Sequence, residues 1–143
     1  VSGSLTAALA GREAMPPTVA RNAGSIAVSI DMPRSTRQAL EALRRTNGLA
    51  VTLEDAAILE AQSRLAQTTG LFVEAASATV FAAIDRLRNT GTITGDQSVV
   101  AIATSSGLKD IGVVPSPGPP TSPTNPDLEG LARALKDAYG FDV

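Results

Sequence analysis

The sequence contains no cysteine, no histidine and no tryptophan, and aromatic residues make up only 3% of its 143 residues. The absence of cysteine excludes disulfide bonds and metal sites built from thiolates. The absence of histidine removes the commonest metal ligand and the side chain that most often acts as a base near neutral pH. The composition therefore excludes zinc chemistry and hydrolytic triads from this chain, and we expect no metal site.

Long apolar runs and a strong net charge are also missing. No stretch approaches the roughly 18 apolar residues that a membrane-spanning helix needs, and none has the pattern of a signal peptide. A net charge of −2 provides no positive field to attract nucleic-acid phosphates. We therefore expect a cytoplasmic protein that binds neither membranes nor nucleic acids.

The length of 143 residues suffices for one ordinary hydrophobic core but not for two. Apolar residues make up 43% and charged residues 18%, which predicts a folded chain. Much of the apolar fraction is alanine, which removes little area from water when it is buried. We therefore expect a thin core whose stability depends on packing against something else.

Helical and strand-like segments alternate along the chain. Small and β-branched apolar residues run without interruption from Ser98 to Ala103, which is typical of a strand buried on both faces. Such an alternation favours an α/β fold with a parallel sheet. The predicted strands are 26–30, 49–51, 71–73 and 98–103, and the predicted helices are 4–11, 35–46, 52–70 and 76–90, with capping pairs at Ser35/Gln38 and Thr52/Asp55.

The C-terminal quarter differs in composition from the rest. Six of the twelve residues from Pro115 to Pro126 are proline, which predicts an extended linker. Leu128, Leu131 and Leu135 then form one apolar stripe, which is typical of a docking helix. The predicted organisation is an α/β portion at 1–114, a linker at 115–126 and a docking helix at 127–143.

Three segments carry a recognisable pattern by their order and spacing: ALEALRRTNGLAVTLEDAAILE at 39–60, TGLFVEAASA at 69–78 and TSSGLKD at 104–110. Together they resemble the C-terminal part of threonine-synthase-like enzymes. These enzymes belong to the tryptophan synthase β-like family, which depends on pyridoxal phosphate (PLP). The second segment is similar to the family pattern T-E-G-I-F-x-E-P-A-S-A and the third to T-G-H-G-L-K-D. The resemblance covers residues 4–110.

The resemblance implies a three-layer αβα architecture around a parallel sheet, with PLP as the cofactor. PLP stores the electrons of a substrate carbanion in its ring. In this family a Ser or Thr hydroxyl faces the ring nitrogen, and Thr104 matches that position. Thr104 also follows the best predicted strand, at the edge of a parallel sheet where ligands bind. The resemblance further implies that Ser105, Glu74 and Ser77 line the cofactor site.

Each of these side chains also has an ordinary structural interpretation. Thr104 could merely satisfy a turn, and Ser105 and Ser106 are typical turn residues. Ser77 could bond to the backbone within the first turn of its own helix. Glu74 could be an acidic residue favoured by the dipole at a helix start.

The chain departs from the family patterns at three positions, with Ala75 in place of proline, Ser105 in place of glycine and Ser106 in place of histidine. A side chain in place of glycine restricts how closely the loop can approach the cofactor, so the identity of the substrate is left open.

The family's Schiff-base lysine and its glycine-rich phosphate loop lie upstream of the matched part. The lysines here are Lys109, which matches the motif lysine of G-L-K-D, and Lys136. Lys109 and Asp110 are interpreted as a pair that holds the loop. We therefore assign no catalytic residue and expect the chain alone to be inactive. The expected partners are the missing N-terminal part of the enzyme and a second subunit of a homodimer.

The resemblance implies a lyase that converts O-phosphohomoserine and water into threonine and phosphate. Two alternatives stay open. One is another β-eliminating or β-replacing enzyme of the superfamily, such as a serine/threonine dehydratase-like protein. The other is a non-catalytic α/β module for binding or assembly. A lysine-bearing segment encoded in frame upstream of Val1 would favour the enzyme, and a start codon at Val1 would favour the module.

Overall fold

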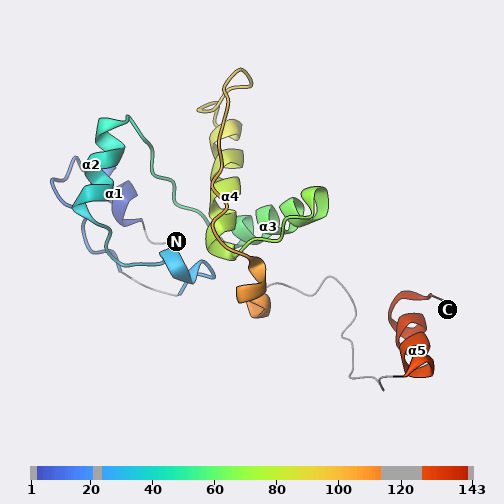
Figure 1. The fold of residues 1–143 in the computed structure, drawn as a ribbon. Coiled ribbons are helices and arrows are strands. Elements are labelled where there is room, and N and C mark those ends of the chain that lie inside the picture. The colour runs from blue at the N-terminus through green and yellow to red at the C-terminus, as the bar shows by residue number, and fades with distance from the viewer. Residues whose placement is uncertain (1–2, 21–23, 114–126, 142–143) are drawn as a thin grey trace. The chain divides into compact units, whose positions relative to one another are not determined.

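The computed structural model describes residues 3–20, 24–113 and 127–141, and the chain divides into two compact units, Val1–Ile111 and Gly112–Val143. The first unit contains α1 (Ser4–Ala10), α2 (Arg37–Arg45), α3 (Asp55–Thr69) and α4 (Ala75–Asn89), with the 3-10 turns η1 (Val28–Ile30) and η2 (Gly107–Lys109) (Figure 1). The turn η3 (Ile111–Val113) spans the division, and α5 (Leu128–Tyr139) lies in the second unit. Of the described helices, none is both long and apolar enough to cross a membrane.

The core of the first unit is centred on α3 and α4, which pack against each other. Its buried members are Ala27, Leu53, Ile58, Ala61, Val73, Ala75, Ala78 and Ala82. Five of these eight residues are alanine, so the core is thin, as the composition predicts. Gly70 ends α3 with a φ of 75°, a left-handed conformation that favours glycine.

The predicted parallel sheet is not formed by the described residues, which contain no strand and only one isolated antiparallel bridge, between Val73 and Ser106. Part of the predicted strand at 26–30 is the 3-10 turn η1. The segments 49–51 and 98–103 have no regular structure. The described residues therefore do not confirm the expected parallel sheet.

The physical reason is clearest at 98–103. A strand is stable only when a neighbouring strand pairs with its N–H and C=O groups. Within the part of the chain that the structure describes, no backbone hydrogen bond involves these six residues. The side chains of Val100 and Ile102 are 89% and 70% exposed. The apolar pattern at 98–103 therefore indicates a strand propensity, but no neighbouring strand within the described residues pairs with this segment.

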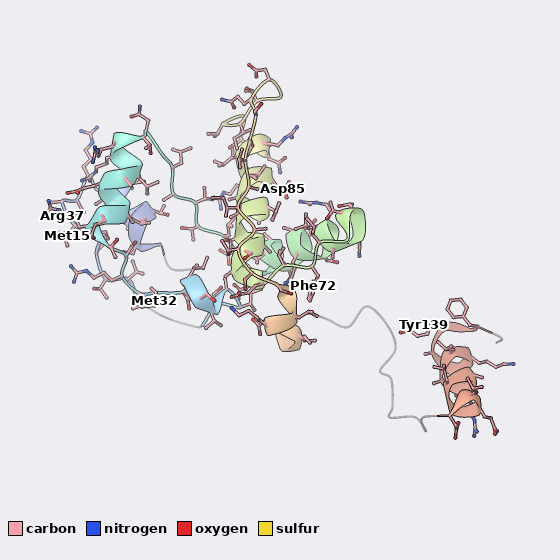
Figure 2. All side chains as sticks on the ribbon, in the orientation of Figure 1. Met15, Met32, Arg37, Phe72, Asp85 and Tyr139 are labelled. Carbon is pink, nitrogen blue, oxygen red and sulfur yellow. The ribbon has the colours of Figure 1, made fainter. Side chains whose placement is uncertain are left out.

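Many other large apolar side chains of the first unit also reach solvent, including Met15 and Met32, which project from the ribbon in Figure 2. Together with the thin core, this exposure fits the prediction that the first unit packs against something else.

The predicted helix caps need two corrections. Thr36, not Ser35, caps α2, and its hydroxyl accepts from the Ala39 amide at 3.2 Å. Thr52 does not cap α3, because the N-cap position is Glu54, and the Thr52 hydroxyl lies 3.2 Å from that of Thr6. Asp55 instead holds an earlier segment: it accepts from the Ser25 hydroxyl at 2.6 Å and from the Ile26 amide at 3.2 Å.

In the second unit, Asp127 caps α5 by accepting from the Gly130 amide at 2.6 Å, and Gly140 ends the helix with a φ of 71°. Leu128 and Leu131 of the predicted apolar stripe are exposed. The predicted linker at 115–126 lies outside the described residues.

Candidate functional site

The loop at 104–109 is held against the segment that leads into α4. The Glu74 amide donates to the Ser105 carbonyl at 3.0 Å, and the Gly107 amide donates to the Phe72 carbonyl at 3.1 Å. These two hydrogen bonds flank the bridge between Val73 and Ser106. Two motifs that lie about 30 residues apart in the sequence are thereby joined at the N-terminus of α4.

Ser77 and Thr104 form the closest side-chain contact between these motifs. Their hydroxyl oxygens lie 2.9 Å apart, and Ser77 also accepts from the Ser105 amide at 3.2 Å. Ser77 is buried and Thr104 is exposed. The structural interpretation of Ser77 as a partner of its own helical turn is wrong, since its hydroxyl bonds to the loop. All four predicted site residues, Thr104, Ser105, Glu74 and Ser77, are brought together here.

Glu74 is a buried carboxylate surrounded by hydrogen-bond donors. One carboxylate oxygen accepts from the Ser29 hydroxyl, and the other accepts from the Lys109 ammonium at 3.1 Å. Hydrogen bonds from Ser29, Lys109 and Ser105 lower the pKa of Glu74 from 4.5 to about 2. Glu74 occupies the N-cap position of α4, but its side chain makes no capping hydrogen bond. The carboxylate is therefore ionised at neutral pH, and it accepts hydrogen bonds from residues outside its own helix.

Lys109 and its neighbours give the loop its shape. The expected pairing of Lys109 with Asp110 is wrong in its partner, because the Lys109 ammonium bonds to Glu74. Ser106 behaves as a turn residue, as predicted: its hydroxyl accepts from the Leu108 amide at 3.2 Å and caps η2. Gly107 lies so close to Phe72 that an added Cβ would stand 2.6 Å from the ring.

Ser29, which contacts Glu74, is a residue of this site that the sequence did not predict. It lies in η1, in a segment predicted to be a strand, and no motif marks it. Its hydroxyl reaches a carboxylate 45 residues further along the chain. A local pattern carries no signal of such a contact.

The hydroxyl pair of Ser77 and Thr104 suits a neutral ring nitrogen. A hydroxyl has one donor and two acceptor positions, so Thr104 can bond to a ligand while it keeps its contact with Ser77. Because Thr104 is exposed, such a ligand could approach it. The residues present therefore fit the ring-nitrogen side of PLP. The amine of Lys109 is already paired with Glu74.

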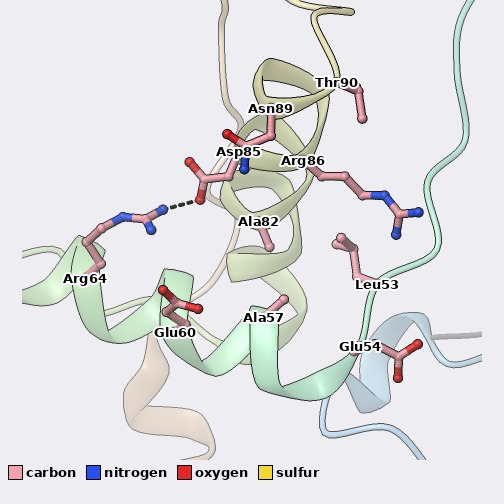
Figure 3. Close-up of a pocket in the computed structure, with 10 residues that line it drawn as sticks. All are labelled: Leu53, Glu54, Ala57, Glu60, Arg64, Ala82, Asp85, Arg86, Asn89 and Thr90. Carbon is pink, nitrogen blue, oxygen red and sulfur yellow. Dashed lines mark hydrogen bonds and ion pairs between the residues drawn. The ribbon is translucent and has the colours of Figure 1, made fainter.

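A separate groove of about 520 Å³ lies between α3 and α4 (Figure 3). Leu53, Ala57 and Ala82 form its apolar lining, and the ion pair between Arg64 and Asp85 crosses one end. None of the four predicted site residues lines this groove. The groove is therefore distinct from the predicted site at the start of α4.

Comparison with known proteins identifies relatives, several of which are threonine synthases. A family model described as pyridoxal-phosphate dependent enzyme matches residues 2–105. The threonine synthase of Methanocaldococcus jannaschii is 35% identical over 111 residues, which are 78% of this chain and 27% of that protein. The threonine synthase of Methanosarcina acetivorans is 40% identical over 98 residues, 68% of this chain and 23% of that protein. That of Mycobacterium tuberculosis is 31% identical over 109 residues, 76% and 30% of the two chains.

The chain therefore spans only about a quarter of the length of the first two of these relatives. The matches confirm the resemblance to threonine synthases, and PLP is the cofactor of the matched family. Because the family model covers well over half of the sequence, the chain belongs to the pyridoxal-phosphate dependent enzymes.

Proposed function

We propose that this chain is the C-terminal part of a PLP-dependent lyase that resembles threonine synthase and converts O-phosphohomoserine and water into threonine and phosphate. The observation that carries the proposal is the contact between Ser77 and Thr104, whose hydroxyl oxygens lie 2.9 Å apart. It joins two of the motifs that this chain shares with the family, and it presents a neutral hydroxyl at an exposed position. PLP, when bound, supplies the electron sink for the substrate carbanion.

The proposed cofactor-site residues are Thr104, Ser105, Ser77 and Glu74. Thr104 faces the ring nitrogen, and a hydrogen bond with Ser77 holds the Thr104 hydroxyl in place. A neutral hydroxyl does not hold a proton on the ring nitrogen as a carboxylate would, which moderates the electron sink and favours elimination and replacement. Ser105 and Glu74 form the adjoining wall.

The remaining part of the same enzyme is the proposed partner, and it would supply the Schiff-base lysine and the phosphate loop. Two observations support this. The amine of Lys109 is engaged by Glu74. Val99, Val100 and Ile102 are exposed, and the backbone of 98–103 has no hydrogen-bond partner within the described residues. We expect the chain alone to be inactive, and we propose that the whole enzyme is a cytoplasmic homodimer. We also propose α5 as a docking helix, because its leucines form one apolar stripe.

A chimera tests the proposal. The aligned segment of the Methanocaldococcus jannaschii threonine synthase is replaced by the matching part of this chain, and PLP binding, threonine formation and phosphate release are measured. We expect all three. The control is the same chimera with the additional substitution Thr18→Ala, at an exposed position outside the motifs. It should behave like the chimera without this substitution.

Other outcomes separate the alternatives. A chimera that binds PLP and deaminates serine or threonine, but releases no phosphate from O-phosphohomoserine, would favour a dehydratase-like enzyme. A folded chimera that does not bind PLP would overturn the proposal and favour a non-catalytic module.

A further inference from the structure

Three separate stretches of the chain meet at Glu74. The Ser29 hydroxyl, from η1, donates to one oxygen of its carboxylate. The Lys109 ammonium, from the end of η2, donates to the other oxygen at 3.1 Å. The backbone amide of Glu74 donates to the Ser105 carbonyl at 3.0 Å. One residue therefore connects the N-terminal segment, the start of α4 and the loop that carries Thr104.

We infer that Glu74 is a positioning residue, whose carboxylate holds Ser29 and Lys109 together and thereby fixes the loop at 104–109 so that the Thr104 hydroxyl stays against Ser77. The inference rests on the proposed function and deepens it, because it states how Glu74 serves the cofactor site. Glu74 would act through the loop and not by contact with the reacting atoms.

The environment of the carboxylate excludes two other roles. A general acid or base needs a pKa near the working pH, whereas the pKa of Glu74 is lowered to about 2, so it stays ionised at neutral pH and is a weak base. Glu74 is also not a helix cap, because its side chain makes no capping hydrogen bond to α4. A buried carboxylate must be compensated by donors. Here Ser29 donates to one oxygen and Lys109 to the other, and both come from distant segments.

The two donors differ in what they contribute. The Lys109 side chain is 64% exposed, so the pair is open to solvent at its cationic end, but the carboxylate end is only 9% exposed. The ammonium therefore tethers η2 to a fixed, buried point. Ser29 ties the same point to η1, next to the core residue Ala27. The order of the Thr104 loop is thus expected to depend on a serine 75 positions earlier in the sequence.

The test uses the 143-residue chain without cofactor and compares Glu74→Gln, Lys109→Met and Ser29→Ala with the wild type. Amide hydrogen exchange is measured at Ser105 and Gly107, which are hydrogen-bonded in the loop, and at Ala82 within α4. We expect exchange at Ser105 and Gly107 to rise by about tenfold or more in Glu74→Gln and Lys109→Met, the size typical of a lost charge-assisted hydrogen bond. Exchange at Ala82 should be unchanged.

A second measurement reports on Thr104 directly. The three-bond scalar couplings of its side chain indicate one χ1 rotamer when the hydroxyl is held by Ser77 and an average of rotamers when it is not. We expect averaging in Glu74→Gln and a single rotamer in the wild type. Lys109→Arg keeps a charged donor, so its Thr104 couplings should match those of the wild type. Lys136→Met changes a charge in the second unit and should leave the Thr104 couplings unaltered.

The outcomes are decisive in both directions. Wild-type exchange and couplings in a folded Glu74→Gln variant would overturn the inference. An equal rise at Ser105, Gly107 and Ala82 would show a general structural role and would overturn it as well. Ser29→Ala removes one donor and keeps the charge, so exchange at Ser105 and Gly107 should rise in it as well, by less than in Glu74→Gln. Unchanged exchange in Ser29→Ala would overturn the part of the inference that concerns Ser29, even where Glu74→Gln does not fold. Because no cofactor is present, these results are independent of the chimera that tests the proposed function.

Discussion

The hydroxyl oxygen of Ser77 lies 2.9 Å from that of Thr104, although the two residues are 27 positions apart in the sequence. Ser77 is buried in the first turn of α4, and Thr104 is exposed on the loop that leads to η2. The buried partner is fixed by its helix, so it can hold the exposed one in a single orientation. This contact is the centre of the candidate site, and the first two predictions concern it.

Thr104→Val should weaken PLP binding by at most about tenfold in the chimeric enzyme, because one neutral hydrogen bond is lost. Thr104→Asp should act differently, since a carboxylate favours a protonated ring nitrogen and changes the balance between elimination and side reactions such as transamination. The measurements are PLP affinity and product distribution, with circular dichroism as the check on folding. If both folded variants match the wild type, Thr104 does not face the ring.

Ser77→Ala should destabilise the first unit by about 1–3 kcal/mol, because it removes a hydroxyl that serves two partners, Thr104 and the Ser105 amide. Urea unfolding followed by circular dichroism measures the change. Ser63→Ala on the exposed side of α3 is the matched control and should change stability by less than about 0.5 kcal/mol. Equal effects of the two substitutions would contradict the role given to Ser77.

Gly107→Ala should destabilise the loop by about 1–3 kcal/mol, because the new Cβ would stand 2.6 Å from the Phe72 ring. Gly95→Ala is the control, since nothing lies within 4 Å of a Cβ built there. Adding Phe72→Leu to Gly107→Ala should recover part of the loss by removing the ring. A Gly107→Ala variant as stable as Gly95→Ala would show that the ring moves aside without cost.

Acid should remove the contribution of Glu74. The pKa of Glu74 in the folded chain is lowered from 4.5 to about 2, first by Ser29 and then by Lys109 and Ser105. The unfolded chain binds more protons in this range, so the contribution is complete above about pH 4.5 and is lost as the pH falls towards about 2. The urea midpoint of the wild type should therefore fall more steeply across this window than that of Glu74→Gln.

The pKa of Asp96 is also lowered, mainly by the hydrogen bond from the Thr94 hydroxyl, and it acts in the same direction. The comparison is therefore made in an Asp96→Asn background, which isolates Glu74. The same acid slope with and without Glu74 would contradict this account.

Val100→Lys should reduce self-association of the isolated chain with little effect on its stability. Val100 is 89% exposed, so its replacement costs little buried area. A charge on an unpaired apolar segment opposes edge-to-edge pairing with another chain. Sedimentation velocity over a range of concentrations measures the effect, with Thr18→Lys as a control for added charge elsewhere. Equal association of both variants would show that 98–103 does not drive it.

Local features were predictable from the sequence because they depend on neighbouring residues. The glycine stop at Gly70 and the helix now seen at Ala75–Asn89 follow from spacing and conformational preference. The alanine-rich composition predicted a thin core, and the order and spacing of three motifs predicted the family. The strand pattern at 98–103 was equally clear, but a strand also needs a partner, and no local pattern supplies one.

The sequence by itself therefore determined the family, the main helices and the four residues of the candidate site. Only the tertiary structure decided how these residues are paired: that Ser77 turns to Thr104 and not to its own helix, that Lys109 bonds to Glu74 and not to Asp110, and that Ser29 belongs to the cluster. The physical reason is distance along the chain. Contacts between residues 27–45 positions apart are set by how α4, η1 and the loop pack together, and short-range periodicity carries no information about them.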